Sequence, residues 1–334
     1  MKALIVEKPN VAVVKNVPIP QCRADEIRIK VAASGICGTD IHIYRGEYLG
    51  SYPIIPGHEF SGVVDAVGED VTRFKKGDRV AVEPNISCSN CDSCFSNRQN
   101  FCRNWEGIGV TRSGGMAEYA VVPENAAFSI GSLDFFQGAF MEPLSCVLHG
   151  VQKARVRLGD NILIMGAGPI GILLLKTVLA QGAAEVTQLD KNRSRLELAK
   201  KSGASATETD LTNLSNEQFD MVIDATGVPF LMEKSIDLVR KGGTLLWFAV
   251  PSREAKVTIP AFTFFEKGLH IVSSYTSVRN SIQAIRSLQS KRIDVTDLIS
   301  HRLPLEQFTQ GIETIERSEE GVLKVLITFE DTKE

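Results

Sequence analysis

The chain lacks a long apolar run and any run of five or six like charges. Its longest apolar stretch, from Ile162 to Ala180, is interrupted by glycines, a proline and a lysine, so it is typical of a strand, a turn and a helix. Net charge is only −3. These absences argue against a membrane span and against nucleic acid or an anionic membrane as the main partner.

Cysteine is scarce, with 7 in the chain, an odd number. The opening residues, "MKALIVEKPN", contain too short an apolar stretch for a secretory signal, and Glu7 follows it. Both features favour a reducing compartment, where clustered cysteines bind metal more often than they form disulfides. We therefore expect a cytoplasmic protein.

The length of 334 residues and a hydrophobic content of 43% are enough for two domains with sizeable cores. Residues 1–145 contain short β-like runs separated by Gly, Pro and Asp, which predicts an all-β or mixed barrel-like domain. Residues 146–275 alternate strand-like and helical stretches, which predicts an α/β, doubly wound parallel sheet. Residues 276–334 begin with an amphipathic helix and end in a strand.

A glycine-rich turn in the second region predicts a dinucleotide site. "ILIMGAGPIG" places Gly166, Gly168 and Gly171 after an apolar strand and at the start of a helix. The first glycine permits the tight turn, the second lets a pyrophosphate approach the backbone, and the third lets helix and strand pack closely. The helix N-terminus would supply N–H groups to the phosphates.

The cofactor is predicted from the end of the next strand, "EVTQLD", which places Asp190 after Gly171 at the spacing of a ribose-binding acid. A carboxylate there accepts hydrogen bonds from ribose hydroxyls and repels a 2′-phosphate, so NAD is favoured. Lys191 and Arg193 lie beside it, and NADP stays open as an alternative.

Four of the cysteines fall in "CSNCDSCFSNRQNFC" with the spacing Cys-x₂-Cys-x₂-Cys-x₇-Cys. Four thiolates complete the tetrahedral shell of a closed zinc site, which has no position left for a substrate. A disulfide pair and a zinc ribbon for nucleic acid are the alternatives, and the ribbon lacks an accompanying basic face. The predicted ligands are Cys88, Cys91, Cys94 and Cys102.

A second group of metal-binding residue types is scattered through "GICGTDIHIYRGEY" and "PGHEFSG". Cys37, His42, His58 and Glu59 are side chains suited to zinc, and only the fold can bring them together. Taken alone, a buried apolar cysteine and a core histidine explain Cys37 and His58 equally well.

The motifs "CGTDIH", "GHEFSGVVDAVGEDVTRFKKGDRV", the four-cysteine segment and "GAGPIG" together resemble the zinc-containing medium-chain alcohol and polyol dehydrogenases. They fall in the order of that family and cover nearly the whole chain. The resemblance implies a GroES-like β-rich catalytic domain at 1–145, to which 276–334 return, and a Rossmann NAD-binding domain at 146–275. It also implies an NAD-dependent dehydrogenase (EC 1.1.1.-).

The resemblance implies two zinc ions per subunit, one catalytic and one structural. Cys37 and His58 match the catalytic ligands, and Glu142 in "MEPLSCVLHG" stands where the sorbitol and threonine branches carry a ligating glutamate. Glu59 matches a glutamate that binds the metal in some members and lies behind it in others. Asp40 matches a carboxylate that orients the histidine. Cys146 is a less favoured ligand than Glu142.

The family's proton route and cofactor contacts also have counterparts. Thr39 matches the hydroxyl that bonds to the substrate oxygen, and His42 matches the solvent end of the relay, where an ordinary pKa of ~6.5 suits proton exchange. The expected cofactor contacts beyond the glycines are Ile170, Asp190, Arg195, Phe248, Val250, Ser274 and Tyr275.

"EPLSCVLH" resembles the polyol branch, so the predicted reaction oxidises a secondary hydroxyl of an alditol or cyclitol to a ketone. Sorbitol enzymes carry an Arg-Tyr pair where this chain has Thr276-Ser277, with Arg279 out of register. "GVTRSGGMAEYAVVP" is also similar to threonine dehydrogenases, which makes L-threonine 3-dehydrogenase the alternative. Tyr44 and Tyr119 are candidate pocket residues.

A catalytically inactive structural or binding relative is the remaining alternative, but it would be expected to have lost Cys37, His58 or Asp190, and all are present. The resemblance further implies a homo-oligomer, with a tetramer favoured over a dimer.

Overall fold

The computed structural model describes residues 1–47, 51–317 and 320–329. Its backbone separates into two compact units. Unit 1 comprises Met1–Ser145, Val278–Lys291 and Val295–Glu334, and unit 2 comprises Cys146–Ser277 with Arg292–Asp294. The chain therefore leaves the first unit, forms the second, and returns to the first.

Unit 1 is built on a mixed sheet with the order β16-β17-β3-β4-β5-β9, in which β8 pairs with the other end of β3. The strands are β3 (Glu26–Gly35), β4 (Glu59–Val67), β5 (Arg79–Val82), β8 (Tyr119–Pro123), β9 (Ala127–Ser129), β16 (Ile299–Pro304) and β17 (Lys324–Thr328). The hairpin strands β1 (Lys2–Lys8) and β2 (Val11–Asn16) pair with each other, as do β6 (Asn85–Ile86) and β7 (Glu106–Gly107). Most of β3 is buried, consistent with its central position in the sheet.

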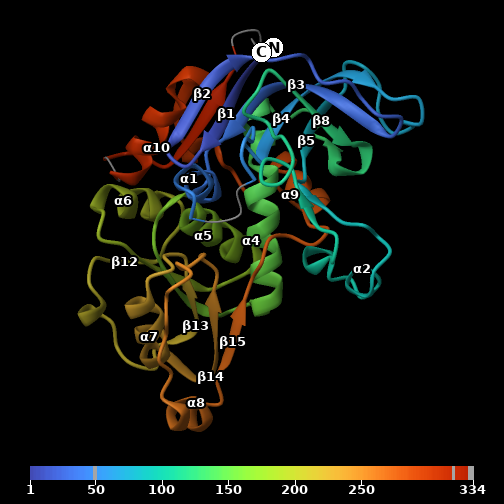
Figure 1. Cartoon of the computed structure of the whole chain (residues 1–334). Helices are drawn as coiled ribbons and strands as arrows, with labels where there is room; N and C mark the ends of the chain where they lie inside the picture. The colour runs from blue at the N-terminus through green and yellow to red at the C-terminus, as the bar shows by residue number, and fades with distance from the viewer. Residues whose placement is uncertain (48–50, 318–319, 330–334) are drawn as a thin grey trace. The chain divides into compact units, whose positions relative to one another are not determined.

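Short helices connect these strands. They are α1 (Gly38–Arg45), α2 (Asp92–Phe95), α3 (Phe135–Ala139), α9 (Ser281–Gln289) and α10 (Phe308–Glu316), with the 3₁₀ turns η1 (Gln99–Phe101), η2 (Glu124–Ala126), η4 (Thr296–Leu298) and η5 (Leu305–Gln307). The long helix α4 (Met141–Ala154) begins in unit 1 and continues in unit 2. In Figure 1 the blue strands β1 and β2 and the red helix α10, from opposite ends of the sequence, lie together in unit 1.

Unit 2 contains a parallel sheet with the order β12-β11-β10-β13-β14-β15. Its strands are β10 (Asn161–Met165), β11 (Glu185–Leu189), β12 (Ala206–Glu208), β13 (Phe219–Asp224), β14 (Val239–Trp247) and β15 (His270–Ser273). The strand order reverses between β10 and β13, and open α/β sheets bind ligands at the carboxyl ends of the strands at this point. The doubly wound parallel sheet predicted from the sequence is confirmed.

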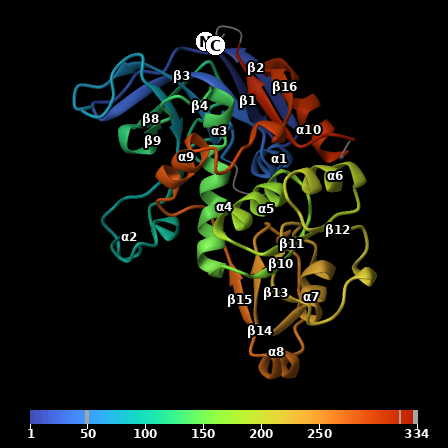
Figure 2. The same ribbon diagram turned by 180° about the vertical axis from the view of Figure 1, so that it is seen from behind.

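The helices of unit 2 follow the local signals in the sequence. They are α5 (Pro169–Gln181), α6 (Arg193–Lys201), α7 (Pro229–Leu238) and α8 (Ala261–Lys267), with the 3₁₀ turn η3 (Leu211–Asn213). Helix α5 begins with proline and ends before Gly182, which has a left-handed backbone. It is largely buried and packs against β10 and β11, and Figure 2 shows it beside α4.

Among the described residues, the structure contains no helix that is both long and apolar enough to cross a membrane.

The end of α7 depends on one buried cation. Lys267, only 8% exposed, donates through Nζ to the carbonyl oxygens of Ile236 at 2.9 Å, Val239 at 3.1 Å and Asp237 at 3.2 Å. The ammonium thereby satisfies carbonyl groups at and just beyond the helix C-terminus, where a positive charge is also favoured by the helix dipole.

We expect Lys267→Met to lower the free energy of unfolding by about 2–4 kcal/mol, because the change leaves buried carbonyl groups without their donor. Lys241→Met is the control, since Lys241 is exposed and lies 3.9 Å from Glu266. It should change stability by no more than about 0.5 kcal/mol. Chemical denaturation of both variants measures the difference, and equal midpoints would contradict the assignment.

Candidate active site and metal centres

The buried carboxylate of Asp40 joins two loops of unit 1. Cys37 is the N-cap of α1, and its backbone N–H donates to Asp40 Oδ2 at 2.8 Å. The other carboxylate oxygen accepts from the N–H of Gly57 at 3.1 Å. Asp40 is 0% exposed. It thus fixes the loop that carries Cys37 next to the loop that leads to His58.

His58 lies immediately before β4, and its Nδ1 is 3.5 Å from Asp40 Oδ1. Burial acts to lower the pKa of the imidazole, but the Asp40 carboxylate and the Cys37 sulfur raise it, and the net pKa is well above the ordinary histidine value. The shift reports a strongly negative environment. Such an environment attracts a cation, which in this place is either a proton or a metal ion.

The fold brings three of the predicted ligands together. One donor atom each from Cys37, His58 and Glu59 lies within 4.8 Å of the others. A sulfur, an imidazole and a carboxylate are the donor types that zinc binds, so the site fits a zinc ion. Glu142 does not belong to this group in the part of the chain that the structure describes. It lies in the first turn of α4 and is 8% exposed.

Sequence reasoning missed Lys324, whose ammonium forms an ion pair with Glu59 inside unit 1. Their side chains are 7% and 1% exposed. Burial opposes the charged ammonium, but Glu59 and Cys37 outweigh it and raise the pKa of Lys324. Gly35 makes room for the pair, since a Cβ atom there would lie 2.3 Å from Glu59 Oε2 and 2.8 Å from Lys324 Cε. The only sequence signal is a lysine that begins an otherwise apolar strand.

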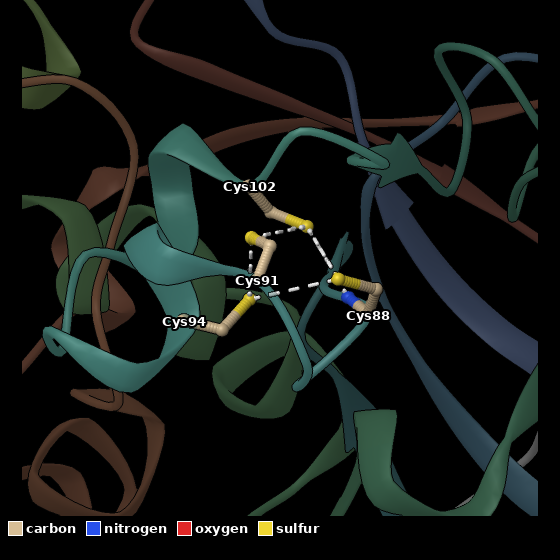
Figure 3. Close-up of side chains that lie close together, drawn as sticks. All are labelled: Cys88, Cys91, Cys94 and Cys102. Atoms are coloured by element: carbon tan, nitrogen blue, oxygen red, sulfur yellow. Dashed lines mark hydrogen bonds between the residues drawn. The ribbon is translucent and has the colours of Figure 1, made fainter.

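The cysteine lobe, residues 85–107, holds the four clustered thiols (Figure 3). All four are free, and consecutive sulfurs around the ring are 3.4, 3.9, 3.5 and 4.0 Å apart. Ligands about 2.3 Å from a tetrahedral zinc lie about 3.8 Å from one another, so the spacing fits a closed zinc site. Backbone N–H groups of Arg103 and Cys94 lower the pKa of Cys91 to about 6, whereas burial raises the pKa of Cys102 to about 11.

Unit 2 contains a cavity of about 810 Å³ whose lining includes Gly166, Asp190, Lys191, Thr226 and Phe230. The cavity lies at the carboxyl ends of β11 and β13, where a dinucleotide is expected.

The three glycines of the turn have different surroundings. Gly166 has φ +101, and a Cβ atom on Gly171 would lie 1.9 Å from the carbonyl oxygen of Gly166. A Cβ atom on Gly168 would meet no atom within 4 Å. The backbone is therefore open at Gly168, as the approach of a pyrophosphate requires, and closed at Gly171. Ile170 follows as the second residue of α5.

Asp190 lies directly after β11 and contacts the glycine turn. Its Oδ2 accepts from the N–H of Ala167 at 2.6 Å, and its Oδ1 accepts from Asn192 at 2.8 Å. Arg195 is in the first turn of α6, where its N–H donates to Asn192 Oδ1 at 3.3 Å. The acid is thus held at the edge of the cavity by backbone groups.

The other expected cofactor residues follow β14 and β15. Phe248 packs near Gly150 of α4, and Val250 is 64% exposed. Ser274 and Tyr275 follow β15. Ser274 Oγ and Thr276 Oγ1 are buried and have no hydrogen-bond partner among the described residues.

Thr39 and His42 both lie on α1. Thr39 is partly buried, two residues after Cys37. The side chain of His42 is 37% exposed, and its Nδ1 is 2.7 Å from Glu47 Oε2. The helix therefore carries one hydroxyl near the metal-binding loop and one imidazole in contact with solvent.

Two family models match this chain. The alcohol dehydrogenase GroES-like domain matches residues 23–132, and the zinc-binding dehydrogenase domain matches residues 169–290. The chain belongs to the zinc-containing medium-chain alcohol and polyol dehydrogenase family. The predicted GroES-like and Rossmann folds are confirmed, and the chain is a zinc-dependent alcohol dehydrogenase that uses NAD(P).

Proteins similar in sequence or structure match nearly the whole chain. D-altritol 5-dehydrogenase of Agrobacterium fabrum is 39% identical over 89% of this chain and 90% of its own length. A zinc-binding dehydrogenase from Sinorhizobium meliloti bound to NADP has a TM-score of 0.94 and 34% identity, covering 98% and 99% of the two chains. An alcohol dehydrogenase from Escherichia coli CFT073 complexed with NADH has a TM-score of 0.92 and 31% identity over the same shares.

The glycine turn allows a matched comparison. Gly171→Ala should lower the free energy of unfolding by more than about 2 kcal/mol, because its methyl group meets a backbone oxygen. Gly168→Ala should leave stability without nucleotide within about 0.5 kcal/mol but weaken NADH binding roughly tenfold or more, because its methyl group occupies the pyrophosphate position. Denaturation curves and NADH fluorescence titrations measure both effects. Tight NADH binding by Gly168→Ala would refute the cofactor placement.

The buried ion pair gives a second prediction. Lys324→Met should cost about 3–5 kcal/mol of stability, because it leaves the Glu59 carboxylate buried without a cation. The double variant Glu59→Gln/Lys324→Met should recover part of this loss, since neither charge remains. Urea denaturation of the metal-free natural chain, the two single variants and the double variant measures this cycle. Losses in the free energy of unfolding that simply add would argue against the ion pair.

Proposed function

We propose that this chain oxidises a secondary hydroxyl of a polyol, an alditol or cyclitol, to a ketone and transfers the hydride to NAD. The observation that carries the proposal is the placement of the Cys37 and His58 donor atoms together, within 4.8 Å of each other and of a Glu59 carboxylate oxygen. Similarity to D-altritol 5-dehydrogenase over nearly the full length supports the polyol. Unit 1 would be the catalytic domain and unit 2 the NAD-binding domain.

Two zinc ions per subunit are part of the proposal. Cys37, His58 and Glu142 would hold the catalytic zinc, and the four cysteines of the cysteine lobe would hold the structural one. Glu59 has Lys324 as its partner, which favours a position behind the metal over direct ligation. Zinc, when bound, supplies a Lewis acid at the substrate oxygen, and NAD supplies the hydride acceptor.

The chain's own residues then hold and move the proton. The hydroxyl of Thr39 would bond to the substrate oxygen and, as it accepts the proton of the alcohol, would pass its own proton on toward His42. His42 would exchange the proton with solvent at the other end of the relay, because its imidazole is partly exposed. Glu47 holds Nδ1 of this ring at 2.7 Å and so fixes its orientation.

NAD is proposed over NADP because the Asp190 carboxylate lies at the cavity edge, where it would repel a 2′-phosphate. Lys191 lines the same cavity, and one similar structure is bound to NADP, which makes NADP the alternative cofactor.

Thr276-Ser277 in place of an Arg-Tyr pair argues against sorbitol itself, and L-threonine is the second candidate substrate. We further propose a homotetramer in the cytoplasm, with neither nucleic acid nor membrane as a partner. The net charge of −3 supports the absence of nucleic acid and membrane partners.

The function is tested by incubating zinc-replete protein with NAD and a panel of alditols, cyclitols, simple secondary alcohols and L-threonine while NADH absorbance is followed. We expect turnover with at least one alditol or cyclitol at a higher kcat/KM than with L-threonine. Turnover of L-threonine alone would select L-threonine as the substrate, and the absence of turnover with every alcohol would reject the proposed dehydrogenase activity.

The two metal sites should separate by substitution. Cys37→Ser should abolish turnover while the melting temperature changes little, because the altered loop lies outside the cysteine lobe. Cys91→Ser should lose the lobe zinc and lower the melting temperature, with residual activity at low temperature. Zinc content by mass spectrometry should fall to about one ion per chain in each variant, following the two-site proposal. Loss of the chemical step from Cys91→Ser in folded protein would reverse the assignment.

Asp190→Ala tests the cofactor preference. Removing the carboxylate should weaken NAD roughly 10- to 100-fold, as expected for lost charge-assisted hydrogen bonds, and should narrow or invert the preference over NADP. Asp210→Ala is a control at another acid of the same cavity. An unchanged NAD/NADP ratio of kcat/KM in Asp190→Ala would contradict the assignment.

A further inference from the structure

The return segment, residues 277–281, carries the chain from unit 2 back into unit 1. Although polar, it is largely buried: Ser277 is 4% exposed, Asn280 3% and Ser281 1%. Arg279, with φ +57, has a left-handed backbone that is uncommon outside glycine. A buried polar segment with such a backbone persists only where its surroundings hold it in place.

The first contact that fixes the return segment is made by the side chain of Arg279. With the Gln99 amide oriented so that its oxygen faces the guanidinium, that oxygen accepts from Nη2 at 2.7 Å and from Nε at 3.0 Å. Gln99 begins η1 of the cysteine lobe, and its backbone carbonyl accepts from the N–H of Cys102 at 2.9 Å. Gln99 therefore contacts both the guanidinium of Arg279 and the backbone of Cys102, a predicted zinc ligand.

The second contact connects the segment to the beginning of the same lobe. Ser281 Oγ donates to Glu83 Oε2 at 2.8 Å. The other oxygen of Glu83 accepts from Asn85 through the backbone N–H at 3.2 Å and through Nδ2 at 2.6 Å. Asn85 Oδ1 in turn accepts from the indole Nε1 of Trp105 at 3.0 Å. Two independent contacts therefore connect the return segment to the beginning and the middle of the cysteine lobe.

We propose that Arg279 is a positioning residue that fastens the return segment to the cysteine lobe, so that the metal of the lobe holds the chain just after β15 in its binding conformation. The inference deepens the proposed function and rests on it in one respect, because Ser274 and Tyr275, which precede the segment, are taken as cofactor contacts. It gives the lobe a role in binding while leaving it out of the chemical step.

The magnitude follows from the contact. An exposed arginine bonded to a neutral amide contributes about as much as an ordinary hydrogen bond, so its loss should raise the NAD KM roughly three- to tenfold. The turnover number should change less than about twofold, since no group that contacts the reacting atoms is altered.

Hydrogen exchange by mass spectrometry tests the fastening without relying on activity. Gln99→Ala and Arg279→Ala should each speed amide exchange in residues 277–282, and the double variant should be no faster than either single one. Gln99→Glu restores an acceptor for the guanidinium and should return exchange to that of the natural chain. Arg103→Ala is the matched control, because Arg103 is on the same lobe but pairs with Asp92 at 3.7 Å.

The role of the metal is tested with Cys91→Ser, which should speed exchange in the same segment. Unchanged exchange at 277–282 in Gln99→Ala and Arg279→Ala would overturn the fastening, and unchanged exchange in Cys91→Ser would overturn the part played by the metal. Faster exchange with an unchanged NAD KM would overturn the link to binding. The exchange results test the fastening independently of the proposed function. If the proposed function is wrong, the natural chain shows no turnover, but the differences in amide exchange between the variants persist.

Discussion

The rest of the site depends on the buried carboxylate of Asp40. One of its oxygens holds the N–H of Cys37, and the other holds the N–H of Gly57 and faces the ring of His58. Two loops that are separate in the sequence are thereby joined by a single side chain with no exposure to water. A charged group in this position is stable only because backbone donors and a nearby cation compensate for its lost hydration.

The same constraint explains the charge pattern around it. Asp40 and Glu59 place two carboxylates in the interior of unit 1, and Lys324 supplies one buried positive charge beside Glu59. A divalent metal ion would balance the remainder while satisfying donor atoms that are already close together. The cysteine lobe follows another logic, since its four sulfurs surround one point and leave no position for a substrate.

Local patterns made the parallel sheet, the glycine turn and the cysteine lobe predictable from the sequence, since each depends on residues close together in the chain. Lys324 was not predictable, because it reaches Glu59 only through the pairing of β17 with β3, where Leu326 lies opposite Gly35. The contact between Arg279 and Gln99 likewise joins distant segments. The catalytic ligand set stays a prediction, with Glu142 outside the group of donor atoms formed by Cys37, His58 and Glu59.

Anomalous X-ray diffraction at the zinc absorption edge, on crystals of protein grown with zinc, tests the central claim most directly. The account predicts one anomalous peak among the four cysteine sulfurs and a second bounded by Cys37 and His58, with Lys324 still paired to Glu59. A peak only at the cysteine lobe, with Cys37 and His58 free of metal in zinc-saturated crystals, would contradict it.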